Sequence, residues 1–121
     1  MAYGRKMTGG KYHKFSKKKK YSLPGIENKV KLRETKRKIV RTLGGNNKII
    51  LLSADYANVL DTKTKKTKKV KIKNVILTPS NKFLARQNVL VKGAVIDTEL
   101  GKARITNRPS QEGSVNAELL D

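Results

Sequence analysis

Four consecutive lysines, Lys17 to Lys20, lie near the start of the chain inside the stretch KYHKFSKKKKYSLPG. Like charges packed this closely repel one another, so the stretch has little tendency to collapse into a core of its own. It either remains solvated or binds a polyanion. The run therefore divides the chain into a basic segment that stays extended and a remainder that must supply the fold.

The rest of the charge follows a gradient along the chain. The 121 residues include 29 Lys and Arg against 9 Asp and Glu, a net charge of +20. Residues 1–48 hold 16 of these basic residues and 2 acidic ones, residues 49–86 hold 9 and 2, and residues 87–121 hold 4 and 5. Such a gradient indicates a basic arm joined to a nearly neutral body. It favours a polyanionic partner: a nucleic acid, an anionic membrane or a strongly acidic protein.

The composition also excludes several classes of protein. The chain contains no cysteine, which excludes disulfides and thiolate metal sites and is compatible with a reducing compartment. No apolar run approaches the roughly 18 residues that a membrane-spanning helix needs. No apolar segment follows the basic N-terminus, as it would in a secretory signal. With length for one domain, we expect a cytoplasmic protein that does not associate with membranes.

Residues 1–36 lack the periodicity of a folded element. Their apolar side chains follow neither the 3.6-residue period of a helix nor the two-residue period of a strand, and glycines and a proline interrupt them. Such a segment has little to bury and stays extended in isolation. We therefore predict two regions: an extended basic arm over residues 1–36 and a β-rich body over residues 37–121.

The body begins with patterns that are typical of short strands. KIVRTLGGNNKIILL, residues 38–52, predicts two strands joined by a turn at Gly44–Asn47, and residues 56–60 predict a third. A polar loop, DTKTKKTKK, then leads to VKIKNVILTP, where Val70 and Ile72 alternate with lysines until a proline ends the run. The alternation predicts a strand with one buried face and one solvent face.

The second half of the body predicts one helical turn among further strands. SNKFLARQN, residues 80–88, is the convincing helical stretch, with Ser80 as its N-cap. Strand-like runs follow over residues 89–109, with a turn at Leu100–Gly101, and residues 114–120 predict a last strand. Six or seven short strands between glycine and asparagine turns predict an all-β fold, a small barrel or sandwich. Closure of the sheet would hide its edges.

The arm combines cations with aromatic side chains, a composition that suits RNA. Lysine and arginine neutralise phosphates, and flat rings accept unstacked bases. A solvated tail that aids solubility is the alternative, but such a tail does not need interleaved aromatic residues. The candidate phosphate-binding residues of the arm are Arg5, Lys6, Lys11, Lys14, Lys17, Lys18, Lys19 and Lys20. The candidate base-stacking residues are Tyr3, Tyr12, His13, Phe15 and Tyr21.

Two basic stretches of the body are further candidate contacts with RNA. In KRKIVR, residues 36–41, a strand would place Arg37 and Arg41 on one face with Ile39. In residues 62–74, a basic hairpin tip would reach an RNA groove. The alternatives are a strand kept soluble by charge and an edge strand protected from pairing by lysines. The candidate RNA-binding residues of the body are Arg37, Lys38, Arg41, Lys48, Lys65, Lys66, Lys68, Lys69, Lys71, Arg86, Arg104 and Arg108.

The chain offers no convincing catalytic or metal-binding constellation. His13 is its single histidine and lies in the arm. Asp97 and Glu99 would share a strand face, but they are more simply surface charges that balance Lys102 and Arg104. GRKMTGGK is one residue too long for the GxxxxGK phosphate loop and is not followed by serine or threonine. We expect no enzymatic activity, no cofactor and no metal.

Three long blocks carry a resemblance to a known family. KRKIVRTLGGNNKIILL, ADYANVLDTKTKKTKKVKIKNV and VKGAVIDTELGKARITNRPSQEG with VNAELL, in this order, resemble the eighth archaeal/eukaryotic-type protein of the small ribosomal subunit, and the short length resembles its archaeal members. The resemblance implies a structural protein that binds ribosomal RNA, with a small β-rich body, a basic N-terminal extension, no cofactor and no catalysis. By position, residues 5–11 resemble the family's GR…TGGK segment and residues 36–46 its KRK…R…GGN segment.

The sequence therefore predicts a structural constituent of the small ribosomal subunit. Its expected partners are small-subunit ribosomal RNA and neighbouring ribosomal proteins, with no small-molecule substrate and no homo-oligomer. Two alternatives remain open: a chromatin-type protein that coats DNA, and a ribosome-assembly factor. Competition by duplex DNA separates the first alternative from an RNA-binding protein, because a DNA-coating protein would show little preference for RNA.

Overall fold

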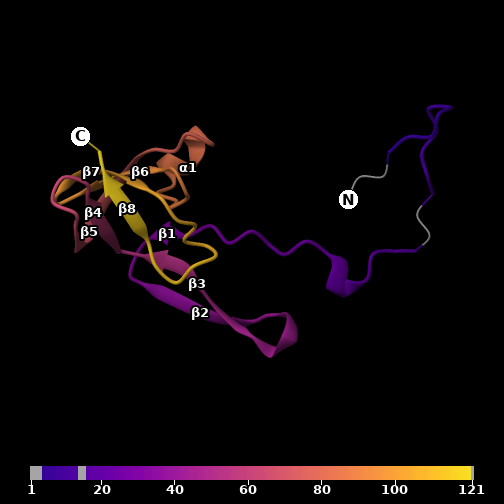
Figure 1. Cartoon of the computed structure of the whole chain (residues 1–121), viewed down its shortest axis with the longest axis horizontal. Coiled ribbons are helices and arrows are strands. Elements are labelled where there is room, and N and C mark those ends of the chain that lie inside the picture. Colours follow the sequence, from indigo (N-terminus) through magenta and orange to yellow (C-terminus); the bar gives the residue numbers. More distant parts are fainter. Residues whose placement is uncertain (1–3, 14–15, 121) are drawn as a thin grey trace.

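The computed structural model describes residues 4–13 and 16–120, and within that part of the chain it contains eight strands in two sheets (Figure 1). The small sheet comprises β1 (Lys31–Leu32), β2 (Lys36–Arg41) and β3 (Asn47–Ala54), in the order β1-β3-β2. The other five strands close a barrel: β4 (Tyr56–Asp61), β5 (Lys66–Leu77), β6 (Val95–Thr98), β7 (Gly101–Ile105) and β8 (Asn116–Leu119). The all-β prediction is confirmed, with eight strands where six or seven were expected.

The barrel closes because its last strand returns to its first. β8 pairs in parallel with β4, whereas the other neighbouring strands of the barrel pair antiparallel. Along β5, the buried side chains of Val70, Ile72 and Val75 face the core, while Lys71 and Lys73 are exposed. The predicted alternation is therefore confirmed. Two register shifts against β6, after Ile72 and after Val75, accompany the path of this 12-residue strand around the barrel.

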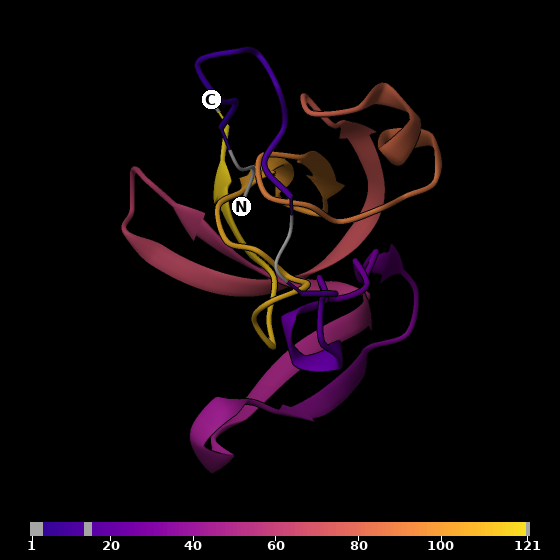
Figure 2. The same ribbon diagram turned by 90° about the vertical axis from the view of Figure 1, so that its right-hand side faces the viewer.

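The small sheet is a hairpin with one short strand added to it. β2 and β3 pair antiparallel around a 3₁₀ turn, Leu43–Gly45, in which Gly44 has a φ of +77° that favours glycine. The hairpin reaches away from the barrel (Figure 2). The two strands and the turn predicted for residues 38–52 are thus confirmed, and the predicted loop of 61–69 is shorter because β5 already begins at Lys66.

The packed part of the chain begins at Val30. This side chain is fully buried, and its carbonyl accepts a hydrogen bond from the amide of Leu90 at 2.8 Å. Leu32 packs partly buried against the same core, whereas Lys31 is exposed. The expectation that residues 1–36 carry no two-residue period was therefore wrong over KVKLR, residues 29–33, where burial alternates and the two-residue strand β1 forms. The division into an arm over 1–36 and a body over 37–121 remains a prediction.

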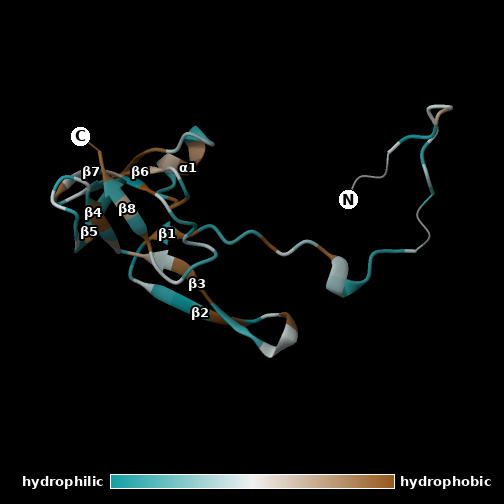
Figure 3. Ribbon diagram, in the orientation of Figure 1, coloured by the Kyte–Doolittle hydropathy of each residue, from teal (hydrophilic) through white to brown (hydrophobic). Residues whose placement is uncertain are grey.

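Two helical segments and the arm complete the structure. The helix α1 (Lys82–Arg86) begins after Asn81, whose side chain accepts a hydrogen bond from the amide of Phe83, so Asn81 and not Ser80 is the N-cap. In the arm, the 3₁₀ turn η1 (Lys20–Ser22) interrupts a long extended path (Figure 1). Most of the arm is hydrophilic, as its teal and white colouring indicates (Figure 3).

Over residues 4–13 and 16–120, no helix is both long and apolar enough to cross a membrane.

Candidate nucleic-acid interface

The first described residues fold into a small closed turn. Arg5 and Lys11 form an antiparallel bridge, the amide of Lys6 donates to the carbonyl of Gly10, and the amide of Gly9 donates to the carbonyl of Lys6, both at 2.9 Å. Gly9 has a φ of +80°, as the left-handed position of a three-residue hairpin loop requires. The Arg5 guanidinium donates to the carbonyl of Gly9 at 2.9 Å. The glycine pair of GRKMTGGK therefore turns the chain.

The aromatic side chains of the arm are open to solvent. Tyr12 is exposed with the Lys6 ammonium 5.7 Å from its ring centroid, and Tyr21 is 89% exposed in η1. His13 is exposed as well. Among the predicted residues, Arg5, Lys6, Lys11, Lys17, Lys18, Lys19 and Lys20 are also exposed. The predicted residues Tyr3, Lys14 and Phe15 lie outside the described part of the chain. The described cations and rings are thus available to a partner, although their binding roles remain predictions.

The β2–β3 hairpin presents predicted basic residues on both faces. The pairing register and strand alternation place Arg37 and Arg41 with Ile39 on one face, and Lys38 with Lys48 on the other. The side chains of Arg37, Lys38, Ile39 and Arg41 are exposed. Lys48 is partly buried, and its ammonium donates to the Gln111 side-chain oxygen. Lys48 is therefore held against the loop before β8, while the two arginines remain free to reach an anion.

The β4–β5 hairpin holds its basic tip by hydrogen bonds to one carboxylate. Asp61 accepts hydrogen bonds from the Thr64 hydroxyl at 2.7 Å and from the Lys63 amide at 3.0 Å. These bonds, with the Thr64 hydroxyl the larger cause, hold the pKa of the Asp61 carboxyl below its ordinary value. Lys65 has a φ of +53°, an uncommon conformation for lysine. The predicted hairpin tip is thus a defined turn that presents lysines to solvent.

The predicted lysines of β5 divide between its two faces. Strand alternation places Lys69 and Lys71 on the outer face, whereas Lys66 and Lys68 lie on the other face and line a hollow with Asp61, Thr64, Leu100 and Leu119. The Lys69 ammonium lies 4.7 Å from the centroid of the Tyr56 ring on the neighbouring strand. Only the outer pair therefore adjoins an aromatic surface.

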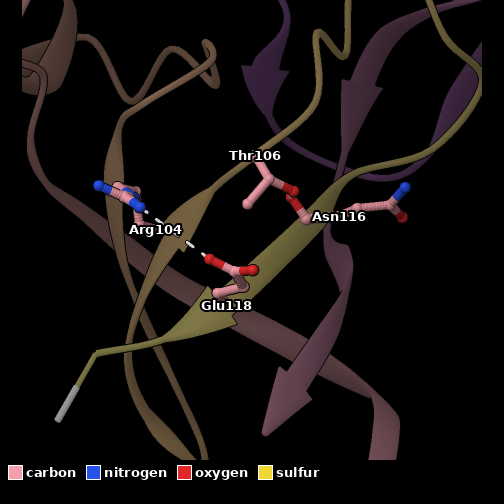
Figure 4. A network of polar contacts seen from close by, with 4 residues as sticks. All are labelled: Arg104, Thr106, Asn116 and Glu118. Atoms are coloured by element: carbon pink, nitrogen blue, oxygen red, sulfur yellow. Dashed lines mark hydrogen bonds and ion pairs between the residues drawn. The ribbon is translucent and has the colours of Figure 1, made fainter. Parts of the chain in front are cut away.

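The remaining predicted arginines are spread over the body. Arg86 ends α1 with its guanidinium 6.0 Å from the Phe83 ring centroid. Arg104 of β7 lies 4.0 Å from the carboxylate of Glu118 on β8, with Thr106 and Asn116 further along the same sheet (Figure 4). Glu118 thus balances Arg104, where Asp97 and Glu99 were expected to do so. Arg108 is exposed in the loop between β7 and β8. These three arginines thus come from a helix, a strand and a loop.

Sequence reasoning missed a basic groove beside the small sheet. Four cations that are absent from the list of candidate residues, although Lys36 belongs to the predicted KRKIVR stretch, line a hollow of about 570 Å³ together with Glu34, Thr35, Leu52 and Ser53. These cations are Lys29, Lys31, Arg33 and Lys36. The signal was present in KVKLR, where basic residues alternate with Val30 and Leu32 at the period of a strand. The groove lies where the arm enters the body, so it continues the positive charge of the arm.

The described part of the molecule is suited to binding an extended polyanion. Its cations lie on an exposed arm, a hairpin, the outer face of β5 and one groove, and phosphate neutralisation needs many such contacts rather than one pocket. Among residues 4–13 and 16–120, no cluster of three or more His, Cys, Asp or Glu residues is placed to hold a metal. Fold and surface together define a small, strongly basic β-barrel protein with an extended arm.

Comparison with known proteins narrows this class to one family. The profile of the family "Ribosomal protein S8e" matches residues 2–120, and the chain belongs to this family. Proteins named "Small ribosomal subunit protein eS8" are 49% identical in Methanococcus aeolicus, over 97% of this chain and 92% of the relative, and 48% identical in Sulfolobus acidocaldarius, over 96% and 91%. A relative of the same name in Ignicoccus hospitalis is 48% identical over 97% and 92%. The predicted family resemblance is confirmed, and membership of a ribosomal-protein family supports the prediction of a protein that is not an enzyme.

Proposed function

We propose that the protein is a structural constituent of the small ribosomal subunit in the cytoplasm, where it binds and stabilises folded small-subunit ribosomal RNA and contacts neighbouring ribosomal proteins. Membership of the S8e family and three archaeal relatives named as small-subunit proteins support this proposal. The net charge of +20 supports it independently, because a compact protein with this charge needs a dense anion to offset self-repulsion.

The arm is the observation that carries the RNA-binding part of the proposal. Every described side chain from Gly4 to Lys29 is exposed, so this segment forms no core with the body. Fixing an extended chain costs roughly 1–2 kcal/mol per backbone residue. Release of counterions from phosphates supplies an opposing free energy that grows with each neutralised phosphate. The arm therefore becomes ordered by threading between RNA helices, and the barrel anchors it at one end.

The body adds contacts at fixed positions. The basic groove of Lys29, Lys31, Arg33 and Lys36 begins where the arm ends, and Arg37 and Arg41 follow on β2. Lys31 of β1 and Lys36, Arg37 and Arg41 of β2 stand on paired strands, so their spacing changes little on binding. The body thus docks on an RNA surface of matching shape, while the arm follows the path of the backbone.

Salt dependence of RNA affinity tests the mechanism directly. The protein is titrated against a fluorescently labelled small-subunit rRNA transcript at salt concentrations from about 50 to 200 mM. We expect the logarithm of the binding constant to fall linearly with the logarithm of salt, by about 0.7 to 0.9 per phosphate neutralised. An affinity that stays constant over this range would contradict the proposal.

Competition and sedimentation test the identity of the partner. Excess random duplex DNA should displace the rRNA transcript poorly, whereas equal displacement by DNA would favour a chromatin-type protein. In a sucrose gradient of a native extract, the protein should migrate with small subunits and leave them at high salt. Migration free of every RNA-containing particle would overturn the proposed function.

A further inference from the structure

A second groove lies between the small sheet and the barrel. It has a volume of about 300 Å³, at the lower end of pockets that hold small ligands. Its lining combines Tyr56 and Asn58 of β4, Lys69 of β5 and Arg37 of β2 with Glu34 and Asp55. An aromatic ring, two cations, an amide and two carboxylates thus meet in one hollow.

The side chains on the barrel wall are held in place. The Lys69 ammonium lies 4.7 Å from the Tyr56 ring centroid, an arrangement that restrains both side chains, and the tyrosine is 43% exposed. The Asn58 side-chain amide donates to the Asn116 side-chain oxygen at 3.1 Å, which fixes the orientation of its amide group. The ring therefore offers a flat, partly open surface whose position does not depend on a ligand.

The two carboxylates are unusual in so basic a region. Glu34 and Asp55 are two of only four acidic residues before residue 87. Neither lies within 4.0 Å of a cation in the described part of the chain, although Arg37 and Lys69 line the same hollow. Asp55 accepts a hydrogen bond from the Thr35 hydroxyl, which restrains its carboxylate. A site for phosphate alone would not contain two carboxylates, because both repel an anion.

The basic groove adjoins this hollow. Both are lined by Glu34 and Thr35, with Lys29, Lys31 and Arg33 lining the groove and Tyr56 lining the hollow. A nucleic-acid strand that follows the cations with its phosphates would bring one base to the ring. Carboxylates accept hydrogen bonds from the exocyclic amino groups of bases, and uracil has no such group.

We propose that this hollow binds one unpaired nucleotide of the RNA, with its base against Tyr56, its phosphate near Arg37 and Lys69, and its exocyclic amino group donating to the Glu34 carboxylate. The inference rests on the proposed RNA-binding function and adds to it a choice among bases. The site accepts cytosine, adenine or guanine and rejects uracil, whereas the arm neutralises phosphates without regard to sequence.

Three single-stranded probes of equal charge test the proposal: a decamer of uridine, the same decamer with one central cytidine, and the same decamer with one central abasic site. We expect the full-length protein to bind the cytidine probe about tenfold more tightly than the other two. Tyr56→Ala should lower affinity for the cytidine probe about tenfold, since base stacking on an aromatic ring is removed, and Tyr56→Phe should restore it. Tyr21→Ala, in the arm, is the matched control and should leave the ratio between probes unchanged.

Glu34→Gln provides the independent variant, because this exposed side chain is not needed for the core. A glutamine amide both donates and accepts, so the preference for cytidine over uridine should fall to about one, while the dependence of affinity on salt should match that of the wild-type protein. Equal affinity of the wild-type protein for all three probes, with its salt dependence intact, would overturn the nucleotide site and leave the proposed function standing. Loss of salt-dependent binding to every probe would instead count against the proposed function.

Discussion

The arm and the barrel carry positive charge in opposite structural settings. From Gly4 to Lys29 every described side chain is exposed, and the local order comprises one small hairpin turn and one 3₁₀ turn. On β5, by contrast, exposed lysines alternate with buried Val70 and Ile72, so that their positions follow from the packing of the core. The cations of the arm therefore have no fixed geometry, whereas those of β5 have positions set by the packed barrel.

The aromatic residues of the two regions show the same difference. Tyr21 in the arm is almost fully exposed, whereas Tyr56 in the barrel is half-buried and restrained by Lys69. A ring of the first kind can stack on any base that the RNA presents, at the cost of ordering the arm. A ring of the second kind is already positioned, so its environment selects the base. Under the proposed binding of RNA, the arm therefore supplies affinity and the body supplies selectivity.

Removal of the arm should have the largest effect on binding. Deleting residues 1–27 removes eight basic side chains, and the affinity for the rRNA transcript at about 150 mM salt should fall roughly a thousandfold, since many phosphate contacts are lost. The melting temperature of the truncated protein, followed by circular dichroism, should be unchanged. Retention of nearly full affinity would remove the distinction between arm and body.

A longer truncation sharpens the boundary between the two regions. Deleting residues 1–36 also removes β1 and the fully buried Val30, which accepts a hydrogen bond from Leu90. This variant should therefore unfold at a lower temperature than the variant that lacks residues 1–27. Equal melting temperatures would support a division at residue 36, as predicted from the sequence.

A cavity in the barrel should have the largest effect on stability. Ile96 is fully buried, and Ile96→Ala should lower the free energy of unfolding by about 2–5 kcal/mol, while the matched Ile96→Val should lower it by about 0.5–1.5 kcal/mol. Urea denaturation measures both. RNA affinity of the folded fraction should not change, because the side chain faces the core. A parallel loss of affinity would show that the barrel does more than hold the basic surfaces.

Much of the fold follows from short-range patterns. The period of two over Val70 and Ile72, and the glycines around Gly44, each fix one element without reference to the rest of the molecule, and these predictions are confirmed. The N-cap was misplaced by one residue because Ser80 and Asn81 both suit that position, and the choice depends on which side chain reaches the amide of Phe83.

Features that depend on contacts distant in sequence could not be predicted. The strand at Lys31–Leu32 is two residues long, and its pairing with β3 and its bridge to Val89 become visible only when the chain is folded. The same holds for the hollow around Tyr56, whose lining comes from residues 34 to 115. Local composition identified the basic stretches, but it did not show which cations meet an aromatic ring or a carboxylate.

Removing the same number of charges from the arm and from β5 compares the two regions most directly. Changing Lys17, Lys18, Lys19 and Lys20 to glutamine, or changing Lys66, Lys68, Lys71 and Lys73 to glutamine, removes four charges from exposed positions in either case. If all four arm lysines meet phosphates, the slope of log affinity against log salt should become shallower by about 3. The β5 variant should change it less, because Lys66 and Lys68 lie on the opposite face from Lys71 and Lys73. Equal slopes for the two variants would contradict the proposed difference between the arm and β5.

Two arginines of β2 test the fixed charge of the body. Arg37 and Arg41 are both exposed, so Arg37→Ala with Arg41→Ala should reduce affinity for the rRNA transcript about tenfold and leave the melting temperature within a degree or so. A matched change on the other face of the hairpin, Lys38→Ala, should have the smaller effect of one lost charge. A large fall in melting temperature would show that the arginines stabilise the hairpin rather than contact RNA.

The smallest expected effect concerns the turn that holds the basic tip of the β4–β5 hairpin. Asp61 accepts hydrogen bonds from Thr64 and Lys63, and the pKa of its carboxyl lies below the ordinary value of 3.8. A lowered pKa in the folded state stabilises the protein above the unfolded-state pKa, and this contribution disappears as the pH falls through the folded-state pKa. Asp61→Asn should therefore lower the melting temperature slightly at pH 7, and the difference from wild type should shrink as the pH falls below about 3.8.

Glu99→Gln, at the exposed turn between β6 and β7, serves as the control, and thermal unfolding at pH 7, 4 and 3 measures all three proteins. A difference in melting temperature that persists unchanged at the lowest pH would show that the Asp61 carboxylate charge does not stabilise this tip. The lysines of the tip would then lack the fixed geometry of the barrel, as those of the arm do.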